Sequence, residues 1–357
     1  MELYLAGGCG EHGRNCFYLE SNEEAWLVDC GVMAGKSISW KWPYLHTEQI
    51  RKLKAVFLTH SHADHTGALS WLLSQGYEGP VIAATPTFSQ ISFECRKVIA
   101  LEKICAHMQK GRIGNLELSW GRSGHCEGSV WLHFYTENKS VLFSGDYTEA
   151  SRIYLCDKLR NRSADLAVMD CAYGKDGQTD EEYIYNVIET VKTLQRECKL
   201  VFLPVPKYGR GLDLLLLLKE KMPKSPVFGD EFFCRQAEKV FSGGEWYQKL
   251  SENFLQCLQR DAAAKSGIVF LSDPQLRGKT GERVRKFLQA GACGVMTGTP
   301  EAGSLSETLL NGGQMLFARY PVHMNQRKCQ EILNYNRIKK VVYYHSPDFH
   351  YERRIKI

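Results

Sequence analysis

Short apolar runs separated by turns open the chain, and this pattern predicts strands. Apolar residues dominate Met1–Leu5, Asn15–Glu20 and Trp26–Asp29, and their spacing predicts hairpin-like pairs. Further short strands and helices alternate from there to about residue 176. We therefore expect this first part of the chain to be an α/β domain.

A second pattern, in which helices and strands alternate, begins near residue 177. Asp180–Glu197 carries apolar residues at helical spacing, at positions 184, 187, 188, 191 and 194. The pattern further predicts strands at Leu200–Val205, Pro226–Phe228 and Gly267–Ser272, and helices at Leu212–Lys221, Glu231–Phe241 and Glu282–Ala290. Repeats of strand, helix and strand favour a parallel sheet.

The order of the two patterns predicts one domain interrupted by another. We expect residues 1–176 and 297–357 to form the first domain and residues 177–296 to form the inserted one, both of the α/β class. This topology would place a site in the cleft between the domains, where pockets are common.

The run His60-Ser61-His62-Ala63-Asp64-His65 is the strongest chemical signal in the sequence. It follows an apolar run, residues 55–58, so a strand that ends in a tight loop can direct these side chains to one point. His60 and His62 can point the same way, whereas Asp64 and His65 can serve a second ion. Imidazole and carboxylate suit zinc and similar divalent cations. A chance cluster of loop histidines is the alternative, which the full HxHxDH spacing disfavours.

Four more polar residues stand where apolar runs meet loops, and each is of a type that can bind a metal ion. They are Asp29, His125, Asp146 and His345. Taken alone, an aspartate at a strand end is more often a turn or cap residue. Four such residues in a chain that also holds HxHxDH favour a metal centre.

At these positions the chain resembles the metallo-β-lactamase superfamily. Asp29 is similar to the first motif of that family, the run from His60 to His65 to the second, His125 to the third and Asp146 to the fourth.

The resemblance extends to the β-CASP branch, the nucleases of RNA processing and DNA repair. Asp170 resembles motif A of that branch, His323 motif B and His345 motif C. Pro321-Val322 replaces the small pair that usually precedes the motif B histidine. The match implies a metallo-β-lactamase αββα sandwich with an inserted β-CASP α/β domain, in which helices flank a parallel sheet.

The resemblance and the ligand chemistry together imply two zinc ions. One ion would be held by His60, His62 and His125, the other by Asp64, His65 and His345, with the Asp146 carboxylate as the bridge. A water held between two such ions is a nucleophile near neutral pH.

The same resemblance implies roles for the catalytic residues. His323 would donate a proton to the leaving oxygen or stabilise charge there, and Asp170 would orient it. Asp29 would fix the tautomer of a ligand histidine, and Asp64 counts both as a ligand and as a catalytic residue. The alternatives are an exposed loop histidine for His323 and a helix N-cap for Asp170.

Composition and charge narrow the class of protein. The 357 residues are 44% hydrophobic and 24% charged, as in a globular protein, and the net charge of +5 is compatible with an anionic substrate. The N-terminus lacks the regions of a signal peptide, and no uncharged stretch approaches ~20 residues, so no membrane contact is expected. The 13 cysteines are scattered, which predicts reduced thiols and a cytoplasmic location.

The resemblance to the β-CASP branch, together with the ligand pattern, implies a zinc-dependent ribonuclease that hydrolyses phosphodiester bonds of single-stranded RNA. A hydrolase of DNA, a small phosphodiester or an ester on the same metals is the second interpretation, and a weakly active nucleic-acid-binding protein is the third. Lys207, Arg210, Arg277 and Lys279 could contact phosphates, or they could form a solvated face. Homo-oligomerisation stays open.

Overall fold

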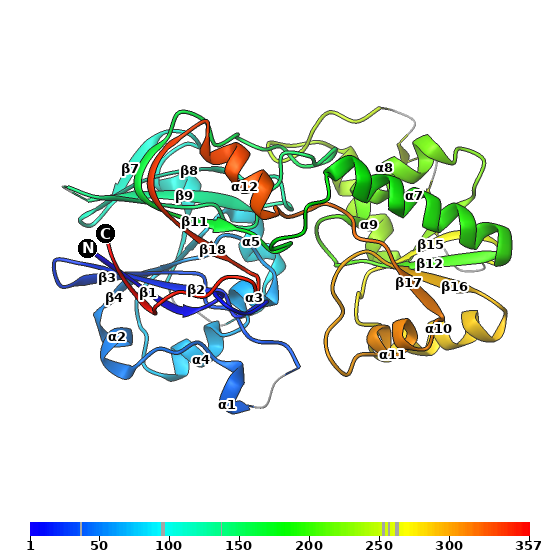
Figure 1. Cartoon of the computed structure of the whole chain (residues 1–357), viewed down its shortest axis with the longest axis horizontal. Helices are drawn as coiled ribbons and strands as arrows, with labels where there is room; N and C mark the ends of the chain where they lie inside the picture. Colours follow the sequence, from blue (N-terminus) through cyan, green and yellow to red (C-terminus); the bar gives the residue numbers. More distant parts are fainter. Residues whose placement is uncertain (36–37, 94–96, 137, 252–253, 256–257, 261–263) are drawn as a thin grey trace. The chain divides into compact units, whose positions relative to one another are not determined.

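The computed structural model describes residues 1–35, 38–93, 97–136, 138–251, 254–255, 258–260 and 264–357, which form two units (Figure 1). The first unit comprises Met1–Glu149, Cys156–Gly177 and His323–Ile357. The second comprises Ala150–Leu155 and Gln178–Val322.

Two sheets packed face to face form the first unit. The seven-stranded sheet has the order β19 (Arg354–Lys356), β1 (Glu2–Gly7), β2 (Cys16–Ser21), β3 (Glu24–Val28), β4 (Leu53–Phe57), β5 (Val81–Ala83) and β6 (Val98–Ala100). The six-stranded sheet has the order β18 (Arg337–Tyr344), β11 (Ser163–Asp170), β10 (Ser140–Phe143), β9 (Val130–Tyr135), β8 (Leu116–Arg122) and β7 (Lys110–Ile113). Buried aromatic rings join the two inner faces: the ring centroids of Phe57 and Phe134 lie 4.7 Å apart.

Helices cover the outer faces of both sheets. Helices α2 (Thr47–Lys52) and α4 (Leu69–Ser74) bury Ile50 and Leu72 against the first sheet, and α12 (Gln326–Leu333) buries Ile332 against the second. The remaining helices of this unit are α1 (Ile38–Lys41), α3 (Ala63–Thr66), α5 (Thr85–Gln90) and α6 (Leu101–Ile104). This layering of helix, sheet, sheet and helix confirms the predicted αββα sandwich (Figure 1).

The second unit is built on one parallel sheet. Its strands lie in the order β14 (Leu258–Arg260), β13 (Val227–Gly229), β15 (Gly267–Leu271), β12 (Leu200–Pro204), β16 (Cys293–Met296) and β17 (Met315–Phe317), and every pair is parallel. The helices are α7 (Asp180–Glu197), α8 (Gly211–Lys221), α9 (Glu231–Phe241), α10 (Gly278–Gln289) and α11 (Leu305–Asn311). The predicted inserted α/β domain with a parallel sheet is therefore confirmed.

Helix α7 has both a capped start and a buried apolar face. Its start is a capping box, in which the Thr179 hydroxyl accepts from the Glu182 N–H while the Glu182 carboxylate accepts from the Thr179 N–H. Two of its apolar residues, Val187 and Val191, are fully buried in the core of the unit. Capping and periodicity thus agree on the same helix.

The second unit is longer than the predicted insertion, residues 177–296. Strand β17 adds to the sheet beside β16, and α11 buries Leu309 against the same core, so the unit continues to Val322. The short segment Ala150–Leu155 also belongs to it, since the Leu155 N–H donates to the Trp246 carbonyl.

One expectation about the cysteines is wrong. Cys198 and Cys293 form a disulfide, although scattered cysteines predicted reduced thiols. The pairing of β12 with β16 brings them together. Cys198 is the C-cap residue of α7, and Val201, which follows shortly after it on β12, lies opposite Cys293. Nine other described cysteines have free thiols.

No helix in the described part of the chain combines the length and the apolar character that crossing a membrane requires.

A buried carboxyl in the second unit makes a first prediction, on stability. The Asp213 carboxyl accepts hydrogen bonds from the Ser151 hydroxyl and the Arg152 N–H, but burial raises its pKa to about 6. A raised carboxyl pKa contributes stability that is present below the unfolded pKa and is lost as pH rises through about 6. Asp213→Asn cannot titrate at this position. Between pH 4 and pH 7 its free energy of unfolding should therefore rise relative to that of the wild type by about 2 kcal/mol.

Urea unfolding at several pH values measures this difference. Asp180→Asn, which removes the same charge from the partly exposed start of α7, is the comparison variant. A curve for Asp213→Asn that runs parallel to that of the wild type would contradict the prediction.

Candidate metal centre

The candidate site lies at the carboxyl ends of strands from both sheets of the first unit. In the first sheet β3 and β4 are parallel, so Asp29 and the loop that begins at Thr59 leave the sheet side by side. In the second sheet β10, β11 and β18 are parallel, so Asp146, Asp170 and His345 lie at neighbouring strand ends. Such ends are where open α/β sheets bind ligands.

The backbone is left-handed at two of these ends. Asp29 has φ 62° and His345 has φ 71°, values that are uncommon for residues with a side chain. Gly145, directly before Asp146, has φ 56°, and a Cβ there would lie 2.4 Å from the Val130 carbonyl oxygen. The backbone conformation at these positions directs the side chains of Asp29, Asp146 and His345 toward the site.

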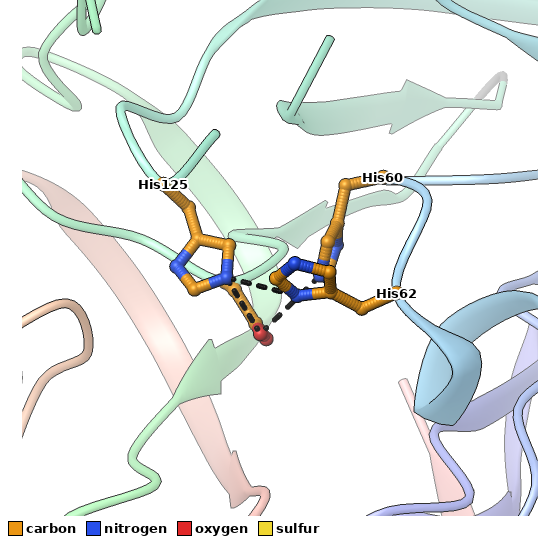
Figure 2. A group of neighbouring side chains, drawn as sticks. His60, His62 and His125 are labelled. Carbon is orange, nitrogen blue, oxygen red and sulfur yellow. Dashed lines mark hydrogen bonds and ion pairs between the residues drawn. The ribbon is translucent and has the colours of Figure 1, made fainter. Parts of the chain in front are cut away.

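Three imidazoles and one carboxylate form the first cluster. Figure 2 shows the rings of His60, His62 and His125 turned toward one another. His125 Nε2 lies 3.2 Å from His62 Nδ1 and 3.6 Å from an oxygen of Asp146. His60 Nε2 lies 3.5 Å from the same carboxylate oxygen. The structure thus brings together all three predicted ligands of one ion and the predicted bridge.

The second cluster contains Asp64, His65 and His345. His345 Nε2 lies 3.0 Å from an Asp64 oxygen, and His65 Nε2 lies 3.8 Å from the same oxygen. Both histidines also approach the second oxygen of Asp146, at 3.2 Å from His65 and 3.3 Å from His345. The Asp146 carboxylate therefore directs one oxygen toward each cluster, as a bridging ligand would.

Asp29 and His65 form a buried pair behind the second cluster. The His65 Nδ1–H donates to Asp29 at 2.7 Å, and the same carboxylate accepts from the N–H and the hydroxyl of Thr59. These bonds fix the His65 tautomer and leave Nε2 facing Asp146 and Asp64.

His323 and Asp170 form a similar pair at the edge of the site. The His323 Nδ1–H donates to Asp170 at 3.0 Å, and Asp170 also accepts from the Tyr147 and Ala172 N–H groups. Asp170 is fully buried, whereas His323 keeps part of its ring accessible. These two residues can form a further cluster with Asp146 and His345.

Neighbouring charges shift the pKa values of the buried carboxyl and imidazole groups in the site. Burial by itself would raise the pKa of the Asp146 carboxyl, but the nearby charges of His65 and His345 lower that pKa well below its usual value. Burial likewise opposes charge on His65, yet Asp146 and Asp29 raise the His65 pKa well above its usual value. The charge of the buried Asp146 carboxylate is thus stabilised by positive charge that lies beside it.

Several nitrogens in the clusters lack the partners that buried polar atoms normally have. Among the described residues, His60 Nε2 and both ring nitrogens of His345 have no hydrogen bond of acceptable geometry. Histidine and aspartate donors suit zinc-like divalent cations, and the ligand atoms within each cluster lie within 4.8 Å of one another. The residues present therefore fit metal ions.

Some residues that contact the clusters were not predicted as site residues. The Asn15 amide lies 2.8 Å from His65 Nε2, the Tyr344 hydroxyl donates to Asp146 at 3.2 Å, and the His12 ring stacks on His345. Tyr344 could have been found from its place beside His345. His12 and Asn15 lie in the glycine-rich segment after β1, whose approach to the site only the fold reveals.

The sandwich and its histidine–carboxylate clusters can be compared with known protein families, and one family profile matches the sequence. The sequence profile described as "Metallo-beta-lactamase superfamily" matches residues 9–89, the part that holds Asp29 and the HxHxDH run. Residues 9–89 are thus similar to the metallo-β-lactamase superfamily, and the αββα sandwich of the first unit agrees with this similarity.

Relatives with similar sequences come from archaea, bacteria and animals. The chain is 28% identical over 251 residues to the "Transcription termination factor FttA" of Methanothermobacter thermautotrophicus, covering 61% of this chain and 39% of that protein. It is 29% identical over 226 residues to the "Ribonuclease TTHA0252" of Thermus thermophilus, covering 57% and 52%. It is 21% identical over 325 residues to the "Cleavage and polyadenylation specificity factor 73" of Drosophila melanogaster, covering 83% and 46%.

The chain spans about half of these relatives' length or less. Among solved structures, a protein of unknown function from Enterococcus faecalis V583 has the same fold, with a TM-score of 0.59 and 13% identity over 99% of both chains.

Proposed function

We propose that this protein is a zinc-dependent ribonuclease of the β-CASP branch, which hydrolyses phosphodiester bonds in single-stranded RNA. The observation that carries the proposal is the convergence of the seven predicted ligands, Asp146 among them, with the His323–Asp170 pair beside them. The parallel-sheet domain between Asp170 and His323 fits the β-CASP branch. The names of the relatives, a ribonuclease and a cleavage factor among them, support an RNA substrate.

The proposed ligands follow the two clusters. His60, His62, His125 and Asp146 would hold one zinc ion, and Asp64, His65, His345 and Asp146 the other. Two bound zinc ions would supply Lewis acids and an activated water as nucleophile.

The histidine–aspartate pairs define what the chain's own residues do. Asp29 holds His65 with its Nε2 toward the cluster, because it accepts the Nδ1 proton. Asp170 holds His323 in the same way, so that His323 Nε2 can give a proton to the leaving oxygen. The ribose oxygen that leaves thus departs as a hydroxyl instead of as an unstable alkoxide.

A panel of substrates tests the proposal against the other hydrolases open to this fold. The purified protein, supplied with zinc, should cleave labelled single-stranded RNA faster than single-stranded DNA or a small generic phosphodiester. Faster turnover of the small phosphodiester would overturn the assignment of RNA. Binding of RNA without cleavage of any substrate would favour a nucleic-acid-binding protein with little catalysis.

Binding of RNA by the second unit makes a further prediction. Lys207 is exposed beside the Phe232 ring, with its Nζ 5.4 Å from the ring centroid, so that an ammonium and an aromatic face lie together. Lys207→Ala should weaken RNA binding about equally for all base sequences, because phosphate contacts carry no sequence information. The slope of log K against log salt should become shallower by about 0.7.

Fluorescence titration of labelled oligonucleotides with the metal-loaded His323→Ala protein, at several salt concentrations, measures both effects. Lys224→Ala removes the same charge elsewhere in the second unit and serves as the control. An unchanged salt slope in Lys207→Ala would remove this residue from the binding surface.

A cytoplasmic location belongs to the same proposal, since it follows from an intracellular RNA substrate. The Cys198–Cys293 disulfide is the observation that argues against a reducing compartment. Alkylation of thiols in freshly lysed cells, followed by mass spectrometry, would show whether this pair is oxidised in its own compartment.

A further inference from the structure

His12 lies directly against His345, although it belongs to none of the clusters that could hold a metal ion among the described residues. The two imidazole rings stack, with their centroids 4.4 Å apart and their planes 16° from parallel. The His12 Nδ1–H also donates a hydrogen bond of 2.8 Å to the main-chain oxygen of His345, because a carbonyl can only accept. One side chain therefore contacts both the ring and the backbone of His345.

The backbone of His345 depends on such contacts. Its φ of 71° lies in the left-handed region, which is unfavourable for a residue with a Cβ and persists only where the surroundings stabilise it. The His345 N–H donates to the Gly8 carbonyl at 2.7 Å, and Cys9 forms a bridge with Ser346. The segment from Gly8 to His12 thus binds both main-chain polar groups of His345.

This backbone conformation sets the direction of the His345 ring. It places Nε2 3.0 Å from Asp64 and Nδ1 3.3 Å from Asp146. Relaxation of φ toward negative values would rotate the Cα–Cβ bond and carry the ring away from both carboxylates.

We propose that His12 is a positioning residue for the second metal ion, which acts by donating its Nδ1–H to the His345 carbonyl. The inference rests on the proposed function in one respect, since it takes His345 as a ligand of that ion. His12 itself touches neither the ion nor the reacting atoms in this account. Its removal should weaken one metal site and leave the His60, His62 and His125 site unchanged.

Two substitutions separate the hydrogen bond from the ring contact. His12→Phe keeps a stacked ring but loses the donor, whereas His12→Asn keeps an N–H donor the same number of bonds from the Cβ. His12→Leu is a second variant without the donor, in case the larger ring does not fit. His350→Phe is the control, because His350 is exposed and lies outside the described metal-binding clusters.

Zinc affinity, measured by competition with a graded series of chelators, is the readout. The wild type should bind two ions, and loss of an outer hydrogen bond typically costs ~10–100-fold in affinity. His12→Phe and His12→Leu should weaken one ion by that factor, while His12→Asn and His350→Phe stay within a few-fold of the wild type. A general loss of stability would not weaken one site of two.

Two results would overturn the inference. Wild-type affinity for both ions in His12→Phe and His12→Leu would show that His345 needs no support from His12. An equal loss in His12→Asn would show that the hydrogen bond is not the cause. A wild-type protein without a second ion would refute the proposed function itself, a failure that the variants cannot mimic.

Discussion

Asp146→Ala should lose both metal ions and, with them, nearly all cleavage of RNA. The Asp146 carboxylate lies within 3.2–3.6 Å of nitrogens of His60, His65, His125 and His345, which come from both clusters. Loss of a single transition-state contact typically costs ~10²–10³-fold. Here both cations would be lost, so we expect turnover to fall by at least ~10³-fold.

Elemental analysis and a single-turnover assay on the same preparation measure the two losses together. Asp165→Ala is a matched control, because Asp165 lies on β11 and pairs with Lys139 and Lys339 away from the clusters. It should retain metal and activity. Two bound ions in Asp146→Ala would contradict the bridging assignment.

His323→Ala should keep both metal ions and lose most of its turnover. The His323 ring donates to Asp170 and reaches Asp146 only at 3.7 Å. The four histidines that approach that carboxylate as predicted ligands lie at 3.2–3.6 Å. A general acid contributes ~10²–10⁴-fold, and we expect a decrease in that range. RNA affinity should stay close to that of the wild type.

Asp170→Asn tests the pair from its other member. It keeps the shape of the Asp170 side chain but weakens its hold on the His323 Nδ1–H, so we expect a smaller decrease in turnover with metal retained. Loss of zinc from His323→Ala would make His323 a ligand, since it can form a cluster with Asp146, Asp170 and His345. An unchanged rate would mean that the proton comes from elsewhere.

The sequence was sufficient for the parts of the site that local patterns specify. The HxHxDH run follows an apolar strand, so its side chains could only emerge at the strand end, and the structure has them at the end of β4. Asp146 and His345 could be predicted in the same way, because each follows an apolar run that predicts a strand. The α7 helix was predicted with its observed bounds, Asp180–Glu197, from its apolar periodicity, and the structure adds the capping box at its start.

Local sequence patterns did not predict the contacts between segments that are distant in the sequence. His12 and His345 are 333 positions apart, and no periodicity relates them. The Cys198–Cys293 disulfide depends on the pairing of β12 with β16, which a list of cysteine spacings does not contain. The continuation of the second unit to Val322 depends in the same way on β17, a strand of only 3 residues. Strand order, which tertiary packing decides, is the information that was missing.

Removal and return of metal is the most direct test of a two-zinc ribonuclease. The purified protein should contain two zinc ions per chain and cleave labelled single-stranded RNA. Dialysis against a strong chelator should abolish cleavage while circular dichroism shows that the fold persists, and two equivalents of zinc should restore it. Undiminished cleavage by the folded, metal-free protein would contradict the account.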